Sequence, residues 1–152
     1  MANTSVNYYG RRADMSLYPP KVFGQPQTMG FGIYPAKAIA GPLKAAQNYA
    51  RVLLASRGEK LEDPTYGTNL ISDFSSGNLM LPMQITQSFS LNNLRAMIYL
   101  REKYEDSTPL DEKIKSATLI DYVIVSKTIV DFEIELVTDS QETLTFLLPV
   151  SY

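Results

Sequence analysis

Residues 130–137 have the sequence VDFEIELV, in which apolar and acidic side chains alternate as far as Leu136. Because successive side chains of a strand point to opposite faces of a sheet, this period of two predicts a strand with one buried face and one wet face. A turn signal follows at 138–141, and then an apolar segment at 143–150; another precedes at 119–125. The C-terminal third is therefore predicted to be a small three-stranded antiparallel sheet.

Upstream of these strands the apolar residues recur with the period of a helix. A first helix is predicted to begin at Gly41-Pro42 and to stop before Gly58. A second is predicted from Ser90, and a short third at 108–111. The face of the second helix that we expect to be buried carries Leu91, Leu94, Met97 and Ile98. Helices followed by strands predict an α+β domain over residues 41–152, with two or three helices packed on the C-terminal antiparallel sheet.

Residues 1–40 are predicted to be an extended arm that is basic and rich in Tyr, Pro and Gly. The first 50 residues carry five basic groups and one acid (5 − 1 = +4), whereas the remainder carries nine and fifteen (9 − 15 = −6). A plain linker has little reason to hold so many aromatic side chains. We expect the arm to bind a neighbouring subunit, including another copy of this chain. The alternative is that it folds back over its own domain.

The composition excludes several chemistries. The 152 residues include no Cys, His or Trp. Disulfides, thiolate nucleophiles, Cys/His zinc sites and imidazole general bases all need side chains that are missing here. The first residues are polar, and no apolar segment is long enough to cross a bilayer. We expect a soluble protein that holds no metal or cofactor and binds no membrane.

The segment 57–70, RGEKLEDPTYGTNL, carries the most specific pattern in the chain. By its local chemistry it is a helix-to-helix connection pinned by one buried aromatic residue, Tyr66. Its spacing also resembles the small baseplate wedge protein of contractile phage tails, a family related to the baseplate wedge subunit of type VI secretion systems. That family has Gly-Glu-Arg, then Pro, then Phe or Tyr followed by Gly. Only Lys60 departs from this pattern, and the resemblance extends over residues 41–152.

The resemblance implies a structural component of a virion tail baseplate, assembled in the host cytoplasm. Such a subunit docks on the larger wedge proteins and offers a sheet edge to the first ring of the tail sheath, by β-augmentation. The family often has a Glu-Pro-Arg triplet before its first long strand; here the nearest segments are 112–114 and 104–106, without the Pro and Arg. The residues expected to contact other proteins are Gly58, Glu59, Lys60, Pro64, Tyr66, Gly67, Val130, Phe132, Ile134, Leu136, Leu144 and Phe146.

The sequence also suggests two other functions, a glycoside hydrolase and a nucleic-acid binder. Part of the family carries a lysozyme-like label, and a glycoside hydrolase needs two carboxyl groups about 5 to 10 Å apart. Asp131, Glu133 and Glu135 have a permitted spacing, but such a row is typical of the wet face of a strand. Glu59, Glu62 and Asp63 flank a loop and are equally generic. The basic arm suggests a nucleic-acid binder, but its charge is low and no binding motif is present, so we expect no enzyme and no nucleic-acid partner.

Overall fold

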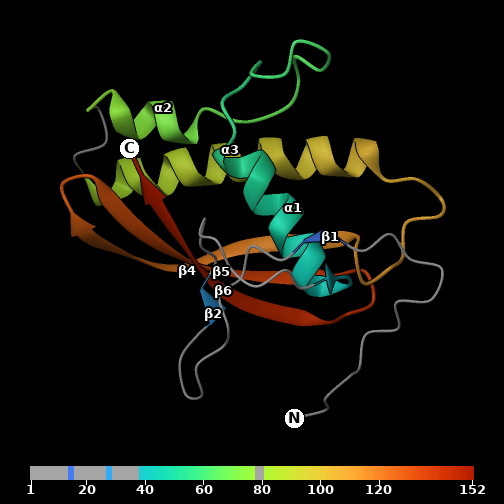
Figure 1. Cartoon of the computed structure of the whole chain (residues 1–152). Helices are drawn as coiled ribbons and strands as arrows, with labels where there is room; N and C mark the ends of the chain where they lie inside the picture. Colours follow the sequence, from blue (N-terminus) through green and yellow to red (C-terminus); the bar gives the residue numbers. More distant parts are fainter. Residues whose placement is uncertain (1–13, 16–26, 29–37, 78–80) are drawn as a thin grey trace.

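A computed structural model describes residues 14–15, 27–28, 38–77 and 81–152. Its helices lie on one side of the C-terminal sheet (Figure 1), which confirms the predicted α+β class. The elements in chain order are β1 (Asp14–Met15), β2 (Gln27–Thr28), β3 (Ala38–Ile39), α1 (Pro42–Leu54), α2 (Leu70–Ser75), α3 (Pro82–Lys103), β4 (Ile114–Ser126), β5 (Ile129–Thr138) and β6 (Thr143–Ser151).

The main sheet has the strand order β2-β6-β5-β4. Strands β4, β5 and β6 form the predicted antiparallel meander, with β5 between the other two. Strand β4 is longer than expected, since it begins at Ile114 rather than Leu119. The two residues of β2 pair with β6 in parallel, and β1 pairs with β3.

The predicted alternation along β5 is confirmed by its burial. Val130, Phe132, Ile134 and Leu136 face the helices and are buried, whereas the acidic residues between them are partly exposed. Phe132 lies at the centre of an aromatic cluster, where its ring contacts Phe89 of α3, Phe74 of α2 and Tyr122 of β4. The core is therefore the layer between the inner face of the sheet and the helices.

Helix α3 differs from its prediction in both start and orientation. It begins at Pro82 rather than Ser90, and the Gln84 side chain accepts the Leu81 N–H at 3.0 Å. Of the predicted inward face only Met97 is buried; the exposed fractions of the other three side chains are 50%, 57% and 48% for Leu91, Leu94 and Ile98. The stripe that faces the core is instead Ile85, Phe89, Asn92, Ala96, Met97 and Leu100.

The connections around α3 also differ from expectation. The predicted helix at 108–111 is wrong: Glu112 and Lys113 both donate to the carbonyl of Pro109, which makes a turn. Helix α2 was not predicted, because its six residues are too few to show a period. The buried Asn92 side chain holds it against α3, accepting the Asn69 N–H and donating to the Asp73 carboxylate, both at 2.9 Å.

The described residues of the arm pair within the same chain, in one place with the domain and in another with the end of the arm itself. Gln27 and Thr28 lie beside Phe146 and Leu147 at the edge of β6. Asp14 and Met15 pair with the strand that leads into α1. Most of the arm lies outside the described residues, so its binding to a neighbouring subunit stays a prediction.

Candidate interaction surfaces

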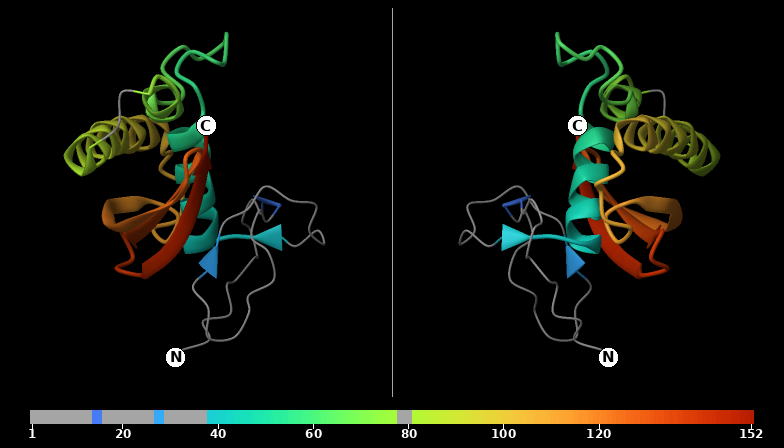
Figure 2. Two further views of the ribbon diagram at one scale, coloured as in Figure 1. Left: turned by 90° about the vertical axis from the view of Figure 1, so that its left-hand side faces the viewer. Right: turned by 90° about the vertical axis from the view of Figure 1, so that its right-hand side faces the viewer.

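The loop that joins α1 and α2, residues 55–69, projects beyond the helices and away from the sheet (Figure 2). Its two arms are held together by main-chain hydrogen bonds. Thr68 N–H donates to the Ala55 carbonyl at 2.8 Å, and Gly58 N–H donates to the Tyr66 carbonyl at 3.1 Å. This α1–α2 loop contains all six residues of the family-like motif, which the structure brings together as one ordered projection.

An aromatic pair anchors the base of the α1–α2 loop. Tyr66 is half-buried, and its ring lies edge-on to that of Tyr99 in α3, with centroids 5.5 Å apart and an interplanar angle of 77°. The Lys60 ammonium lies 3.7 Å from the centroid of the Tyr66 ring, a distance that permits a cation–π contact. The predicted aromatic anchor is confirmed in position, although Tyr66 is less buried than expected.

Asp63 is the polar centre of the α1–α2 loop, a role that sequence reasoning missed. Its Oδ1 accepts the Thr65 hydroxyl at 2.6 Å, while its Oδ2 accepts the Tyr99 hydroxyl at 2.9 Å and lies 2.9 Å from the Lys103 ammonium. The hydrogen bond from Thr65, followed by those from Lys103 and Tyr99, holds the pKa of Asp63 well below its usual range. The Asp-x-Thr spacing typical of an Asx turn was the available signal.

Replacing Asp63 with Asn is expected to lower the pKa of Tyr99. Burial and then the hydrogen bond to Asp63 raise that pKa from 10.0 to about 12, so the variant should titrate between these values. The unfolded chain releases the Tyr99 proton at a lower pH than the folded chain does. The free energy of unfolding therefore falls as the pH rises above 10, and it should fall less in the variant. NMR titration of the Tyr99 ring carbons measures this change.

Thr65→Val provides the matched control. Thr65 binds the other carboxylate oxygen, so its hydroxyl can be removed while the Tyr99 hydrogen bond stays in place. The pKa of Tyr99 should therefore remain near 12 in this variant. An equal pKa of Tyr99 in the wild type and in Asp63→Asn would show that the Asp63 carboxylate does not stabilise the protonated Tyr99 hydroxyl.

The tip of the α1–α2 loop is exposed to solvent. The Leu61 side chain is 99% exposed, and Gly58, Glu59, Lys60 and Pro64 are exposed around it. The conformation of the tip is nevertheless fixed from within, since the Glu59 carboxylate accepts the Ser56 N–H at 3.2 Å. An apolar side chain on an ordered loop is suited to insertion into a pocket of another protein.

The sheet residues that we expected at an interface lie elsewhere. Val130, Phe132, Ile134, Leu136 and Phe146 are all buried in the core, and only Leu144 is partly exposed. Strand β5 is also paired along both of its edges. The alternation therefore marks the buried face of the sheet and not its open edge, and contact of these side chains with a partner stays a prediction.

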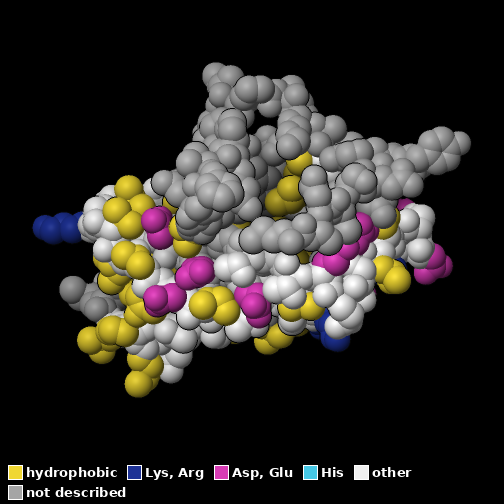
Figure 3. Space-filling model, turned by 90° about the horizontal axis from the view of Figure 1, so that it is seen from below, with side chains coloured by type: hydrophobic (Ala, Val, Ile, Leu, Met, Phe, Trp, Pro, Cys, Tyr) yellow, Lys and Arg dark blue, Asp and Glu magenta, His cyan; other side chains and the backbone are white. Residues whose placement is uncertain are grey.

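The open edge of the sheet belongs to β4. Among the residues that the structure describes, no strand pairs with its outer side, whereas β6 is partly covered by β2. Ile120, Val123, Ile124 and Val125 are between 52% and 59% exposed. Figure 3 shows hydrophobic side chains gathered at the end of the molecule that carries the β4–β5 turn. A long apolar edge of this kind is a template for another strand.

The acidic row of β5 lies on the face of the sheet that points away from the helices. Asp131, Glu133 and Glu135 are partly exposed there, and Figure 3 shows acidic groups across this face. Within the described ranges, no group of three Asp or Glu residues is placed to hold a metal ion. The described helices also include none that is long and apolar enough to span a membrane.

The Glu112 carboxylate, in the segment nearest to the missing triplet, is engaged inside the chain. One oxygen accepts the Gly41 N–H at 3.2 Å, and the other binds the Lys44 ammonium at 2.8 Å.

Comparison of the chain with family models, curated proteins and solved structures finds no match. The α1–α2 loop and the β4 edge are the two surfaces at which the structure best fits contact with another protein.

Proposed function

We propose that this chain is a structural subunit of a contractile-tail baseplate wedge. In this proposal the α1–α2 loop docks on larger wedge proteins and the outer edge of β4 receives a strand of the first tail sheath ring. The observation that carries the proposal is the open, apolar edge of β4. The assembly is proposed to be a contractile-tail baseplate because the α1–α2 loop resembles the wedge protein family.

Strand addition accounts for how such an edge would act. The unpaired N–H and C=O groups of an edge strand bind the main chain of a partner, and alternate side chains set the register. Strand β4 spans 13 residues and offers its edge beside a rigid central strand. Register shifts interrupt its pairing with β5 at three places: between Ile114 and Ser116, between Leu119 and Asp121, and between Ile124 and Ser126. Such irregularities bend the edge and so restrict which strand fits.

The α1–α2 loop supports docking on a second partner. Leu61 provides the apolar anchor and Lys60 is held beside it on the Tyr66 ring. Because the loop is ordered in the free chain, binding would cost little conformational entropy. The basic arm, residues 1–40 at +3 (4 − 1), would bind the acidic bodies of neighbouring copies, residues 41–152 at −5 (10 − 15). The chain would act in the tail baseplate of a virion, without catalysing a reaction.

Replacing Val123 and Val125 with Lys is expected to block sheath assembly while leaving the baseplate intact. Lys on an edge strand discourages strand addition, and both side chains are more than half exposed, so the fold should survive. Sheath polymerisation on baseplates that carry the variant should fall by roughly tenfold or more. Electron microscopy counts sheathed tails, and mass spectrometry measures the variant chain in each baseplate.

The matched control replaces the same two residues with Thr, which keeps strand propensity without adding charge. Sheath should form normally on baseplates that carry this control. Normal sheath on the Lys variant would overturn the role of the β4 edge, whereas absence of the chain from purified baseplates would overturn the proposal itself. Ile134 is unsuitable for such a test because it is fully buried in the central strand.

The alternative, a lysozyme-like glycoside hydrolase, makes a different prediction. Its candidate Glu59 binds the Ser56 N–H on an exposed loop, and Glu133 lies on the outward face of β5. Purified chain should release no soluble fragments from peptidoglycan, even at high protein concentration. Release that Glu59→Gln or Glu133→Gln abolishes would favour the hydrolase and contradict a purely structural role.

A further inference from the structure

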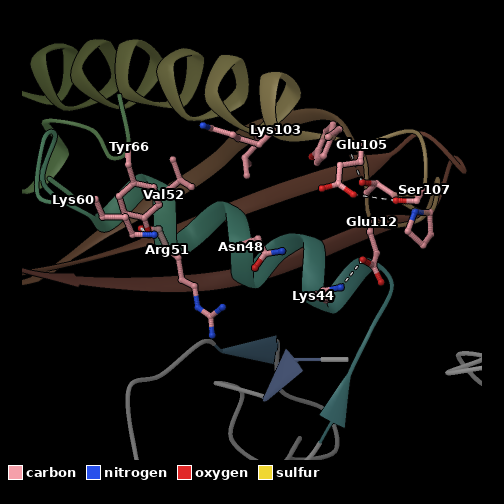
Figure 4. A pocket seen from close by; sticks show the side chains of 14 residues that line it. Lys44, Asn48, Arg51, Val52, Lys60, Tyr66, Lys103, Glu105, Ser107 and Glu112 are labelled. Carbon is pink, nitrogen blue, oxygen red and sulfur yellow. Dashed lines mark hydrogen bonds and ion pairs between the residues drawn. The ribbon is translucent and has the colours of Figure 1, made fainter. Parts of the chain in front are cut away.

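A groove of about 650 Å³ runs beside α1, on the side that faces the C-terminal end of α3 and the segment 104–112. Figure 4 shows Lys44, Asn48 and Arg51 along α1, with the Lys60–Tyr66 pair at one end and Glu105, Ser107 and Glu112 at the other. The groove lies outside the β4 edge, and it shares Lys60 and Tyr66 with the α1–α2 loop. Neither surface described above includes it as a binding site.

The groove is positive on a chain that is negative overall. Lys44, Arg51, Lys60 and Lys103 line it together with two acids, Glu105 and Glu112. Counting also Asp63, which pairs with Lys103, leaves +1 (4 − 3). The whole chain carries −2, and residues 51–152 carry −6. A local reversal of sign in a concave surface attracts negatively charged groups.

The cations are held in place before any ligand binds. Lys44 is paired with Glu112 at 2.8 Å, in a contact with little solvent exposure. Lys103 is paired with Asp63 at 2.9 Å, and Lys60 lies over the Tyr66 ring. Because these side chains are already ordered, a ligand would not bear the full entropic cost of fixing them.

We propose that this groove binds an extended acidic segment of a partner protein. Lys44 and Arg51 are seven residues apart in α1, so two turns of helix place them about 10 Å apart along its axis. In an extended peptide, side chains on one face recur about every 7 Å, which allows successive carboxylates to meet cations along the groove. Val52, Leu100 and Pro109 add apolar contact surface for the main chain of such a segment.

The charge of the groove also selects against other occupants. The basic arm of a second copy, residues 1–40 at +3 (4 − 1), would be repelled. A small anion would use one cation and leave most of the groove empty. This inference does not require the proposed baseplate role, because it rests on the charges, the spacing and the apolar lining of the groove.

Fluorescence anisotropy with a labelled peptide of about eight residues, in which Glu and Gly alternate, tests the proposal on the full chain. Binding should weaken roughly tenfold in Arg51→Gln and again in Lys60→Gln, since each change removes a charged donor. It should also weaken as salt rises from about 50 mM to about 500 mM. Arg57→Gln, an exposed cation of the same loop outside the groove, should bind as the wild type does.

Three results would overturn the proposal. The first is equal binding of a peptide in which Gln replaces every Glu. The second is complete displacement of the peptide by inorganic phosphate at equal concentration, which would indicate a small-anion site. The third is tighter binding of a single-stranded oligothymidylate of the same length, which would indicate nucleic acid. Amide chemical shifts locate the contact, and they should change along α1 and at residues 103–109.

Discussion

Replacing Phe132 with Ala is expected to lower the free energy of unfolding by about 4 kcal/mol. The ring is fully buried on the central strand, and its centroid lies 5.1 Å from that of Phe89 and 5.8 Å from that of Phe74. Its removal therefore leaves a cavity between the sheet and two helices at once. Because the inner core cannot collapse without moving α2 or α3, most of the cavity cost should remain.

Urea unfolding, monitored by circular dichroism, measures this loss of unfolding free energy. The matched control is Ile120→Ala on the neighbouring strand β4, where the side chain is 52% exposed. That change should cost no more than about 1 kcal/mol, because little apolar surface returns to water. A loss of stability in Phe132→Ala no greater than in this control would contradict the packing of the helices on β5.

Replacing Gly67 with Ala is expected to lower the free energy of unfolding by about 3 kcal/mol. The residue has φ +91, a conformation that L side chains rarely adopt. An added Cβ would also lie 2.6 Å from the Ser56 carbonyl oxygen and 2.7 Å from that of Ala55. Both neighbours are main-chain atoms, so relief requires the two arms of the α1–α2 loop to separate.

Gly58→Ala separates the two causes. Gly58 has φ +79, but an added Cβ there meets no atom within 4 Å. Only the conformational cost applies, and the expected loss is about 1 kcal/mol. Thermal unfolding of the two variants compares them directly. Equal losses would show that the close approach of residue 67 to the other arm of the loop contributes nothing to stability.

The contrast between Gly67 and Gly58 also shows which features of the α1–α2 loop can be predicted from the sequence. Glycine, proline and an aromatic residue at fixed spacing mark an ordered loop in any sequence. The Asp63 network was missed because its partner Tyr99 lies 36 residues further along the chain, in α3. Local spacing predicts which residues can turn, whereas a contact of this range exists only once the helices have packed.

Helix α3 shows the limit of a periodic pattern. Leu91, Leu94 and Ile98 recur at spacings of three and four, as do Ile85, Phe89, Asn92 and Ala96 on another side. Both stripes satisfy the helical period, and hydrophobicity alone favours the wrong one. The second stripe is buried because the aromatic ring of Phe89 fits against Phe132, a choice that depends on the shape of the sheet beneath it.

The sequence by itself determined the types of the long elements α1, α3, β4, β5 and β6, and hence the α+β class. The period of two in residues 130–137 specifies a half-buried strand from the chain's own chemistry, without reference to distant residues. Only the tertiary structure decided that β2 pairs with β6, that β4 supplies the open edge and that four cations line one groove. The physical reason is that strand order and helix packing depend on contacts between residues far apart in the chain, which a local period cannot encode.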